Sequence, residues 1–311
     1  MSKASKPSLA TELLGVTLAS PVLNASGTFG LGGQEIDGFN PSCFGAVVTK
    51  TVALLPIAGN LNTVRLWESH GGLINRVGLE GPGIEVFMAE KLPCWLELGV
   101  PVIVNISGSR IDEFVTPVRR LRQSGIIAIE VNLSCPNVEK ERLVFSTDPA
   151  VTRESVSRLV AVAEGMPLII KLTPNVTDIG LIAKVAQEAG ARAISATNTF
   201  KARRYDIRTG KLIIEGGFSG PPIMPQALQK VWEICQAVTI PVIGMGGISS
   251  GEEAIEFFLA GASAVAVGTA GFTQPVSTVP RIVEGISKWL EEHHFSSFEE
   301  FRNRIKETGS L

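Results

Sequence analysis

The sequence has few of the residues that build metal centres and disulfide frameworks. Its 311 residues include four cysteines and three histidines, and no two cysteines form a CxxC pair. Widely scattered thiols are typical of reduced cysteines in the cytosol, so we expect a cytoplasmic protein. His293 and His294 lie in a polar C-terminal segment, where the end of a solvated helix explains them better than a metal site. We therefore predict no metal site on this chain.

An excess of one charge and long apolar runs are also lacking. The 28 Lys and Arg residues nearly balance the 30 Asp and Glu residues, which gives a net charge of −2. This balance offers no electrostatic case for nucleic acid or for an acidic membrane surface as a partner. No apolar run is long enough to span a membrane. Residues 1–8 lack the apolar core of a signal peptide, and we expect them to form a disordered tail.

The sequence does contain a regular succession of short apolar runs. Stretches with helical periodicity separate most of them. Strands that alternate with helices predict a parallel sheet, and eight strands in about this length favour a closed (β/α)8 TIM barrel. No linker or composition shift marks a second domain, so we predict a single domain over residues 1–311. The eight predicted strands are 21–24, 46–50, 100–105, 126–133, 168–172, 193–198, 241–245 and 264–268.

Several predicted helices have recognisable ends. Asp148 followed by a proline predicts the start of a helix that continues through residue 163. Ser250, followed by Gly-Glu-Glu, predicts the start of a helix that runs to residue 259 and is closed by Gly261. Apolar residues at helical spacing also predict a helix over 176–189.

The remaining segments are predicted to be hairpins and loops. A hairpin over residues 9–18 is expected to close the bottom of the barrel. Two spans, 51–83 and 199–225, exceed ordinary connections and follow strand ends, which form the catalytic face of this architecture. We interpret both as long functional loops, the second of which contains a small hairpin over 205–213.

A cysteine lies where the fourth predicted strand gives way to a loop. Residues 132–137 are Asn-Leu-Ser-Cys-Pro-Asn, so that Cys135 stands between the amides of Asn132 and Asn137. A thiol at such a place can act as a base or a nucleophile, and the amides can hold a planar, polar substrate. Taken alone, a free cysteine is more often a small buried hydrophobe. The rest of the chain decides between these interpretations.

Three glycine-rich segments favour a phosphate site. Gly246 and Gly247 end the seventh predicted strand, Gly268 and Thr269 end the eighth, and Gly220 lies in the long loop before the seventh helix. Barrels commonly bind phosphate with these two strand ends and a nearby helix N-terminus, because glycine lets backbone N–H groups approach the anion. A single glycine pair would indicate only an ordinary turn.

Lysines and asparagines complete the set of candidate residues. Lys50 and Lys171 end predicted strands, where a lysine is either half of a structural ion pair or a positive charge beside an electron-accepting ring. One asparagine at a strand end is usually a turn former, whereas several that converge on one barrel mouth indicate a site for a polar ring. The amides in question are Asn24, Asn75, Asn105, Asn132, Asn137 and Asn198.

Taken in order, these segments resemble the dihydroorotate dehydrogenases of the cytosolic, cysteine-using kind. No single piece is specific, but together they cover nearly the whole chain in the order of that family. Membrane-linked members use serine where this chain has Cys135. The matching segments are 24–27, 50–51, 75–79, 132–137, 171–175, 198–199, 219–221, 246–247 and 268–269.

The resemblance implies flavin mononucleotide (FMN) as the cofactor and dihydroorotate as the substrate, with orotate as the product. Cys135 would take a proton from C5 of the substrate while a hydride leaves C6 for N5 of the flavin. The implied cofactor-binding residues are Ser26, Lys50, Thr51, Asn105, Asn132, Lys171, Gly220, Gly246, Gly247, Gly268 and Thr269. The implied substrate-binding residues are Lys50, Asn75, Val77, Gly78, Leu79, Asn132, Asn137, Asn198 and Thr199.

The overall pattern is more similar to the NAD-linked, two-subunit class than to the fumarate-linked homodimers. In that class a separate subunit carries FAD and a [2Fe–2S] cluster, and the resemblance implies a homodimer of this chain within a heterotetramer. The chain has neither a GxGxxG fingerprint nor a cysteine cluster, so we expect that it cannot reduce NAD alone.

Other interpretations remain open at this point. A dihydropyrimidine dehydrogenase-like flavoenzyme is the nearest, although its members tend to have histidine where this chain has Asn137. A non-redox phosphate-binding barrel and a catalytically silent subunit are two more.

Two segments depart from the resemblance. Residues 138–142 replace a stretch that often contains glycine. Residues 201–204 are unusually basic, which indicates a solvated turn, a partner contact or a changed substrate preference.

Overall fold

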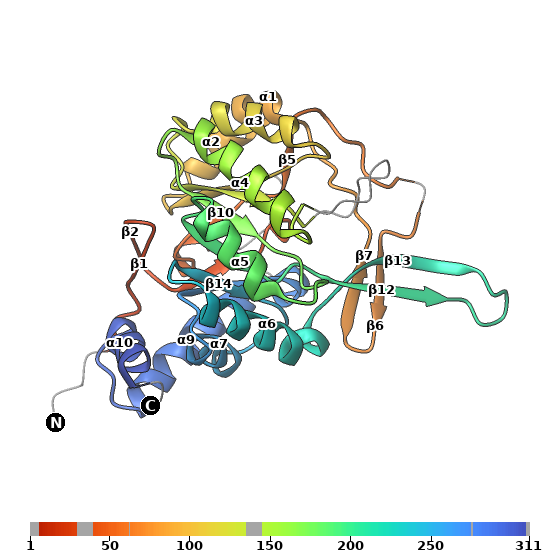
Figure 1. The fold of residues 1–311 in the computed structure, drawn as a ribbon. Helices are drawn as coiled ribbons and strands as arrows, with labels where there is room; N and C mark the ends of the chain where they lie inside the picture. The colour runs from red at the N-terminus through yellow and green to blue at the C-terminus, as the bar shows by residue number, and fades with distance from the viewer. Residues whose placement is uncertain (1–5, 30–39, 62, 135–144, 275, 309–311) are drawn as a thin grey trace.

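The computed structural model describes residues 6–29, 40–61, 63–134, 145–274 and 276–308. Eight strands pair side by side in parallel and curve around a common axis (Figure 1). Their order around the axis is the order in which they follow one another along the chain. In chain order the strands are β3 (Val22–Asn24), β4 (Val47–Val48), β8 (Val102–Ser107), β9 (Ala128–Asn132), β10 (Leu168–Lys171), β11 (Ala193–Ala196), β14 (Val242–Met245) and β15 (Ala264–Val267).

The first and last members of this series also meet. A parallel bridge joins Leu23 to Ala46, and the Gly45 N–H donates to the Val22 carbonyl at 2.9 Å. These contacts bring β3 against β4, so the sheet is nearly closed on itself. The eight strands match the eight predicted apolar runs, and the predicted (β/α)8 barrel is confirmed.

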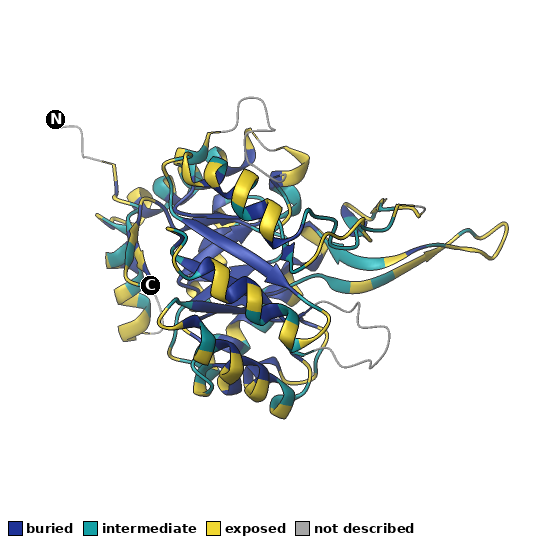
Figure 2. Cartoon of the chain, turned by 90° about the horizontal axis from the view of Figure 1, so that it is seen from above, coloured by how far each residue is buried: buried dark blue, intermediate teal, exposed yellow. Residues whose placement is uncertain are grey.

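Helices surround the strands and turn one face to solvent (Figure 2). The outward side chains of the strands pack with the inner faces of these helices in one large apolar cluster. The helices are α1 (Ile84–Val86), a π-helical turn (Phe87–Lys91), α2 (Leu92–Leu96), α3 (Ile111–Leu121), α4 (Pro149–Ala163), α5 (Ile179–Glu188), α6 (Met224–Ala237), α7 (Gly251–Leu259), α8 (Thr269–Thr273), α9 (Thr278–Glu292) and α10 (Phe298–Thr308), with 3₁₀ turns at Pro41–Cys43 and Pro221–Ile223.

The helix ends follow from local hydrogen bonding. The Asp148 carboxylate accepts from the first two free N–H groups of α4, and Ser250 forms a capping box with Glu253 at the start of α7. Both predicted starts are confirmed. The helix predicted over 176–189 begins only at Ile179, because Asp178 is extended and caps the Leu181 N–H from outside the helix.

The predicted N-terminal hairpin is also confirmed. Strands β1 (Thr11–Leu13) and β2 (Val16–Leu18) pair antiparallel at the end of the barrel away from the strand C-termini. Leu13 and Leu18 are buried and join the apolar cluster inside the barrel. Ser8 departs from the expected tail, since its N–H donates to the Ser296 carbonyl and its carbonyl accepts from the Phe298 N–H.

The two long connections form a second sheet that was not predicted. Strands β6 (Leu66–Ser69) and β7 (Gly72–Asn75) come from the first connection, and β12 (Phe200–Tyr205) and β13 (Leu212–Ser219) come from the second. The four strands pair antiparallel in the order β12-β13-β7-β6, while β5 (Val52–Ala53) extends the barrel beside β8. The sheet projects from the side of the barrel (Figure 1).

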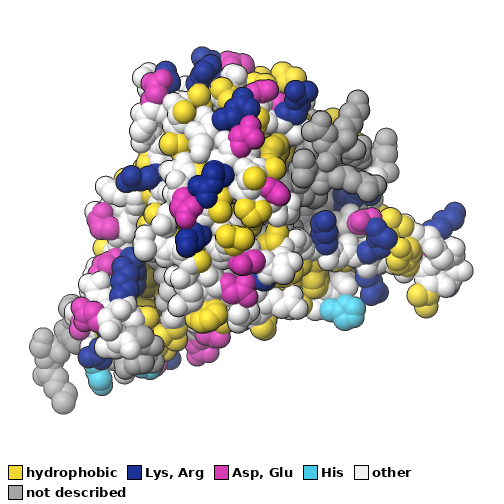
Figure 3. Space-filling view, viewed as in Figure 1, with side chains coloured by type: hydrophobic (Ala, Val, Ile, Leu, Met, Phe, Trp, Pro, Cys, Tyr) yellow, Lys and Arg dark blue, Asp and Glu magenta, His cyan; other side chains and the backbone are white. Residues whose placement is uncertain are grey.

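The hairpin predicted over 205–213 is wider than expected. Its strands pair from Phe200 opposite Phe218 out to Tyr205 opposite Leu212. The basic segment 201–204 is therefore a strand and not a turn. It is largely exposed, and Arg203 forms an ion pair with Glu215 on the facing strand. Lys and Arg side chains are prominent on this projecting part of the surface (Figure 3).

No helix in the described part of the chain combines the length and the apolar character needed to cross a bilayer.

Candidate functional site

The inside of the barrel changes from apolar to polar along the strands. Side chains alternate between the two faces of a strand, so every second residue points inward. On β8 the inward residues are Ile103 and then Asn105, and on β10 they are Ile169 and then Lys171. We call the first set the lower layer, formed by Leu23, Ala46, Ile103, Ala128, Ile169, Ala193, Ile243 and Ala264. We call the second set the polar layer, formed by Asn105, Glu130, Asn132, Lys171, Ser195 and Thr197, all of them buried.

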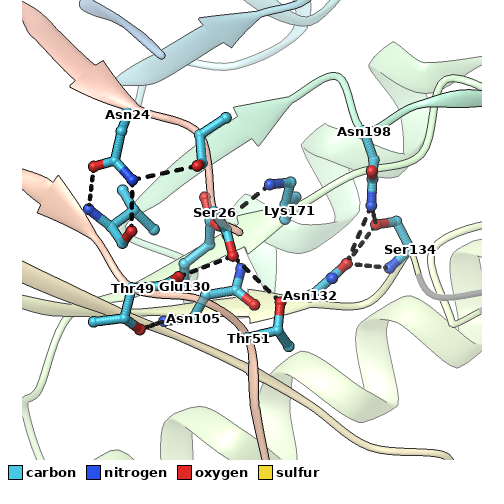
Figure 4. A network of polar contacts seen from close by, with 12 residues as sticks. Asn24, Ser26, Thr49, Thr51, Asn105, Glu130, Asn132, Ser134, Lys171 and Asn198 are labelled. Carbon is cyan, nitrogen blue, oxygen red and sulfur yellow. Dashed lines mark hydrogen bonds and ion pairs between the residues drawn. The ribbon is translucent and has the colours of Figure 1, made fainter. Parts of the chain in front are cut away.

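A buried ion pair lies at the centre of the polar layer (Figure 4). The Lys171 Nζ lies 3.5 Å from Glu130 Oε1, and the two side chains are 6% and 3% exposed. Asn105 donates from Nδ2 to the same carboxylate oxygen. The Oδ1 atom of Asn105 is buried and has no hydrogen-bond partner among the described residues. A bound ligand with an N–H group would satisfy this acceptor.

A second polar cluster joins Asn132, Ser134 and Asn198. Asn132 Oδ1 accepts from the Ser134 hydroxyl, from the Ser134 N–H at 3.3 Å and from Asn198 Nδ2 at 3.4 Å. Asn198 Nδ2 also donates to Ser134 Oγ, and its Oδ1 accepts from the Thr199 N–H at 2.8 Å. These bonds fix the side-chain positions at the ends of β9 and β11 (Figure 4). Asn132 and Ser134 immediately precede Cys135 in the sequence. Cys135 and Asn137 themselves lie outside the described residues.

Hydroxyl groups line the ends of β3 and β4. Ser26 Oγ donates to the Thr49 carbonyl at 2.9 Å and lies 3.2 Å from Thr51 Oγ1. Lys50 is half-buried between these two threonines in the sequence. The structure therefore places Ser26, Lys50 and Thr51 together at one side of the barrel mouth.

Asn24 has a structural role instead of joining the set of ring-binding amides. Its Nδ2 donates to the Val48 carbonyl and its Oδ1 accepts from the Val48 N–H, both at 2.7 Å. The amide thus replaces a missing strand–strand contact between β3 and β4. Because Asn24 is only 1% exposed and both ends of its amide bond the backbone of the neighbouring strand, its role is to join the two strands.

The second sheet brings Asn75 toward the same mouth. Asn75 ends β7, and its Nδ2 donates to the Gly217 carbonyl on β13 at 3.1 Å. Gly217 packs so closely against Thr199 that a Cβ there would lie 2.0 Å from the Thr199 hydroxyl. This glycine therefore serves strand packing and not anion binding, and it contacts both Asn75 and Thr199, the residue after Asn198.

The segment after Asn75 has an unusual backbone. Gly78 and Leu79 both have positive φ, at 82° and 56°. Asn60 supports the segment: its N–H donates to the Val77 carbonyl at 3.0 Å and its Nδ2 donates to the Arg76 carbonyl at 3.0 Å. The predicted substrate-binding residues Val77, Gly78 and Leu79 are therefore held in a turn that few other sequences would adopt.

The predicted phosphate segments meet at the start of α6. Gly220 lies beside Thr269, whose hydroxyl donates to Ser219 Oγ at 2.8 Å. Gly247 has φ of +81° and lies so close to Met224, the first residue of α6, that a Cβ would lie 2.6 Å from the Met224 Cβ. Glycine is required there by the fold itself. Gly268, by contrast, has an ordinary φ of −104° and room for a Cβ.

Two of the three described cysteines, Cys43 and Cys235, are unsuited to catalysis. Burial raises the pKa of the Cys235 thiol to about 12 and also raises the pKa of Cys43. Both thiols are therefore protonated near neutral pH. Within the described ranges, no group of three or more His, Cys, Asp or Glu side chains is arranged to hold a metal ion.

Sequence reasoning missed Glu130 and Ser134 as members of the site. The signal for Glu130 was its position, a single carboxylate within the apolar run 126–131. A buried charge needs a partner, and Lys171 on the adjacent predicted strand was the available one. Of the two possibilities for Lys171, the structural ion pair is present, and it lies inside the candidate site.

A nearly closed parallel barrel with polar groups gathered at the C-terminal ends of its strands is the architecture of the (β/α)8 enzymes, whose active sites lie at that face. Comparison with known proteins narrows this class. The family model described as "Dihydroorotate dehydrogenase" matches residues 8–290, and the chain belongs to this family.

Curated relatives match over nearly their whole length. The chain is 45% identical to a protein of Pelobacter propionicus, over 93% of this chain and 95% of the relative. It is 43% identical to one of Citrifermentans bemidjiense, over 94% and 96%, and 42% identical to one of Alkaliphilus metalliredigens, over 96% and 99%. Each is named "Dihydroorotate dehydrogenase B (NAD(+)), catalytic subunit".

Proposed function

We propose that this chain is the catalytic subunit of an NAD-linked dihydroorotate dehydrogenase, which oxidises dihydroorotate to orotate in pyrimidine biosynthesis. The observation that carries this proposal is the polar layer, which places a buried cation, amides and an unpaired acceptor at the mouth of a barrel of this family. A barrel used only as a scaffold gains nothing from such groups, because buried polar atoms cost free energy unless they are paired.

We propose FMN as the cofactor, and two features of the site fit it. The unpaired Asn105 Oδ1 can accept from an N–H donor, and Lys171 offers a positive charge beside a ring that accepts electrons. At the other end of the site, the backbone of three segments converges around the first turn of α6, where an anion is favoured. The residues that would hold FMN are Ser26, Lys50, Thr51, Asn105, Asn132, Lys171, Gly220, Gly246, Gly247, Gly268 and Thr269.

We further propose that dihydroorotate is held by the amides around Cys135. The Asn132–Ser134–Asn198 cluster presents amide groups whose positions are fixed by mutual hydrogen bonds, so little conformational entropy is lost when a substrate binds. The proposed substrate residues are Lys50, Asn75, Val77, Gly78, Leu79, Asn132, Asn137, Asn198 and Thr199.

Cys135 acts in this proposal as the general base. When bound, FMN supplies the two-electron acceptor that the oxidation needs. The thiolate of Cys135 would accept the proton from C5 of the substrate, while the amides hold the substrate ring. An unperturbed thiol has a pKa of about 8.5, so the proton-transfer step should accelerate as the pH rises toward that value.

We propose a partner subunit because a barrel with a single flavin has no route of its own from that flavin to NAD. Electrons must leave the site for NAD, and the sequence has no dinucleotide fingerprint of its own. We propose a separate subunit that carries FAD and a [2Fe–2S] cluster, a homodimer of this chain within a heterotetramer, and a cytoplasmic location.

The isolated chain tests this function. It should oxidise dihydroorotate with an artificial acceptor and fail to reduce NAD, and adding the proposed FAD and iron–sulfur subunit should restore NAD reduction. Efficient NAD reduction by the isolated chain would contradict the two-subunit proposal. Efficient fumarate reduction would instead place the protein with the fumarate-linked homodimers.

A further inference from the structure

Glu130 is the one charged residue of strand β9, and it is 2% exposed. It faces the barrel interior one inward position below Asn132. On the neighbouring strand, Ile169 pairs with Glu130 and Lys171 pairs with Asn132, so the carboxylate and the ammonium group are diagonal neighbours. The same carboxylate oxygen accepts from Asn105 Nδ2 on the other side (Figure 4). Glu130 thus joins three strands.

Stability alone does not explain this arrangement. Removing two charges from water costs several kcal/mol for each ion, and a well-packed apolar pair at such a place is often as stable or more stable. The adjacent lower layer shows that these strands accept apolar side chains at their inward positions. A buried Glu–Lys pair at the border between the two layers therefore indicates a role in the site.

Glu130 also fixes the direction of the Asn105 amide. A carboxylate only accepts hydrogen bonds, so the Nδ2 of Asn105 must face Glu130 and its Oδ1 must face away. That Oδ1 is one of three buried side-chain atoms without a hydrogen-bond partner among the described residues, and the other two are hydroxyl oxygens, of Ser107 and Ser195. The amide oxygen of Asn105 and the ammonium group of Lys171 thus lie close to the same carboxylate, one as an acceptor and the other as a cation. The pyrimidine part of a flavin ring, which carries an N–H group between two carbonyls, is the complementary chemistry.

We propose that Glu130 is a positioning residue that sets the charge and the hydrogen-bond polarity of the flavin site through Lys171 and Asn105. This inference rests on the proposed function. With Glu130 in place the pair carries no net charge, whereas Lys171 alone would carry one positive charge. Reduced FMN is an anion above neutral pH, so Glu130 weakens its stabilisation. Bound FMN is thereby a stronger reductant, as an NAD-linked electron path requires.

The test measures the affinity of the purified chain for oxidised and for reduced FMN at mildly alkaline pH, and the reduction potential of the bound flavin. In Glu130→Gln the ratio of the two affinities should shift toward reduced FMN by about tenfold to a hundredfold, the scale of one nearby charge at an effective dielectric constant of about 20. For a two-electron couple this is a rise of about 30–60 mV in potential.

Variants of Lys171, the ion-pair partner of Glu130, distinguish an effect of charge from an effect of packing. Lys171→Gln should move the same ratio toward oxidised FMN, and the double variant should lie closer to the wild type than either single variant. A structural role predicts instead that both single variants lose FMN in either redox state, with no change in the ratio. Glu233→Gln, which breaks the Lys230–Glu233 pair (2.9 Å) on the outside of α6, is the matched control and should leave the ratio unchanged.

Each outcome decides one point. An unchanged ratio in Glu130→Gln, or shifts of the same sign in both single variants, would overturn the inference. If Glu130→Gln does not fold, the double variant can replace it, because it leaves no unpaired buried charge. The affinity of the double variant for reduced FMN relative to oxidised FMN should then exceed that of Lys171→Gln, and a value no higher would overturn the inference. Failure of the wild-type chain to bind FMN at all would refute the proposed function, which distinguishes the two failures.

Discussion

The polar layer lies on four of the eight strands that carry the lower layer, β8, β9, β10 and β11, and begins about 7 Å further along each of them. Ile169 and Lys171 illustrate the contrast on β10, and Ile103 and Asn105 illustrate it on β8. The lower layer is covered by the N-terminal hairpin through Leu18 and contains only aliphatic side chains. The polar layer contains an ion pair, amides and hydroxyls.

This difference separates the source of stability from the source of function. Burial of aliphatic surface contributes about 25 cal/mol per Å², whereas a buried polar group at best recovers its desolvation cost by pairing. Changes in the lower layer should therefore alter the free energy of unfolding and leave the chemistry intact. Changes in the polar layer should alter the chemistry, and they should also lower stability where they leave a buried group unpaired. The following substitutions test the separation.

The largest effect is expected at Cys135, beyond the polar end of β9. Cys135→Ala should leave the spectrum of bound flavin unchanged and slow its reduction by dihydroorotate by about 10²–10⁴-fold, the usual contribution of a general base. Single-turnover stopped-flow absorbance measures this rate. Cys94→Ala, which removes a half-exposed thiol on α2, is the matched control and should react at the wild-type rate. A near-normal rate in Cys135→Ala would show that Cys135 is not the general base.

In the lower layer, Leu23→Ala should reduce the free energy of unfolding by about 2–5 kcal/mol, because it leaves a cavity in a closed apolar cluster. Denaturant titration gives this value. The folded fraction should retain its flavin and the wild-type KM for dihydroorotate. Leu212→Ala, at an exposed position on β13, should cost less than about 0.5 kcal/mol. A large change of KM in Leu23→Ala would mean that the two layers are coupled.

Two amides at strand ends offer a sharper comparison. Asn198→Ala breaks the cluster with Asn132 and Ser134 and should lower kcat/KM by about 10- to 100-fold, as expected for the loss of a hydrogen-bonding partner and the misplacement of its neighbours. Asn24→Ala should instead lower stability by about 1–3 kcal/mol and leave KM unchanged, because its amide joins β3 to β4. Steady-state kinetics and thermal unfolding of both variants decide the matter, and exchanged outcomes would contradict the assignment.

The glycines of the phosphate segments differ in the same way. Gly268→Ala has room for its methyl group, so it should fold normally and weaken FMN binding by about fivefold to tenfold, the scale of one hydrogen bond. Gly247→Val should fail mainly through the fold, since its side chain overlaps Met224. Equilibrium dialysis measures the affinity and circular dichroism measures the fold. Unchanged FMN affinity in Gly268→Ala would place the phosphate elsewhere.

The smallest effect concerns the thiols that pack away from the site. With its pKa raised to about 12 by burial, Cys235 should be about one part in ten thousand thiolate at pH 8. Alkylation followed by peptide mass mapping should therefore leave Cys235 unmodified while the native fold persists, and labelling should increase only as the pH approaches that pKa. Rapid labelling at neutral pH would show that this region opens.

The barrel could be predicted because its signals are local. Each apolar run, the Asp148 cap and the Ser250 capping box depend on residues near in sequence. The second sheet could not be predicted in the same way, since β7 and β13 pair across about 140 residues, as the contact between Asn75 and Gly217 shows. Loop length indicated that these segments matter but not which strands they form.

The candidate site was predicted only in part for a similar reason. Residue types at strand ends identified Asn105, Asn132 and Lys171, because parallel strands end at one face. The partner of each group depends on register, so the sequence did not distinguish the structural amide of Asn24 from a ligand-binding one or assign Glu130 to Lys171. The positions of Cys135 and Asn137 lie outside the described residues, and their roles remain predictions from the sequence.

The central claim is that the polar layer holds a flavin that dihydroorotate reduces. Anaerobic titration of the purified chain with dihydroorotate, followed by absorbance in the flavin band, tests it most directly. We expect that the chain carries FMN, and that this band bleaches to completion as orotate forms in equal amount to the flavin present. A chain that binds no FMN, or whose FMN keeps its oxidised spectrum in excess dihydroorotate, would contradict the account.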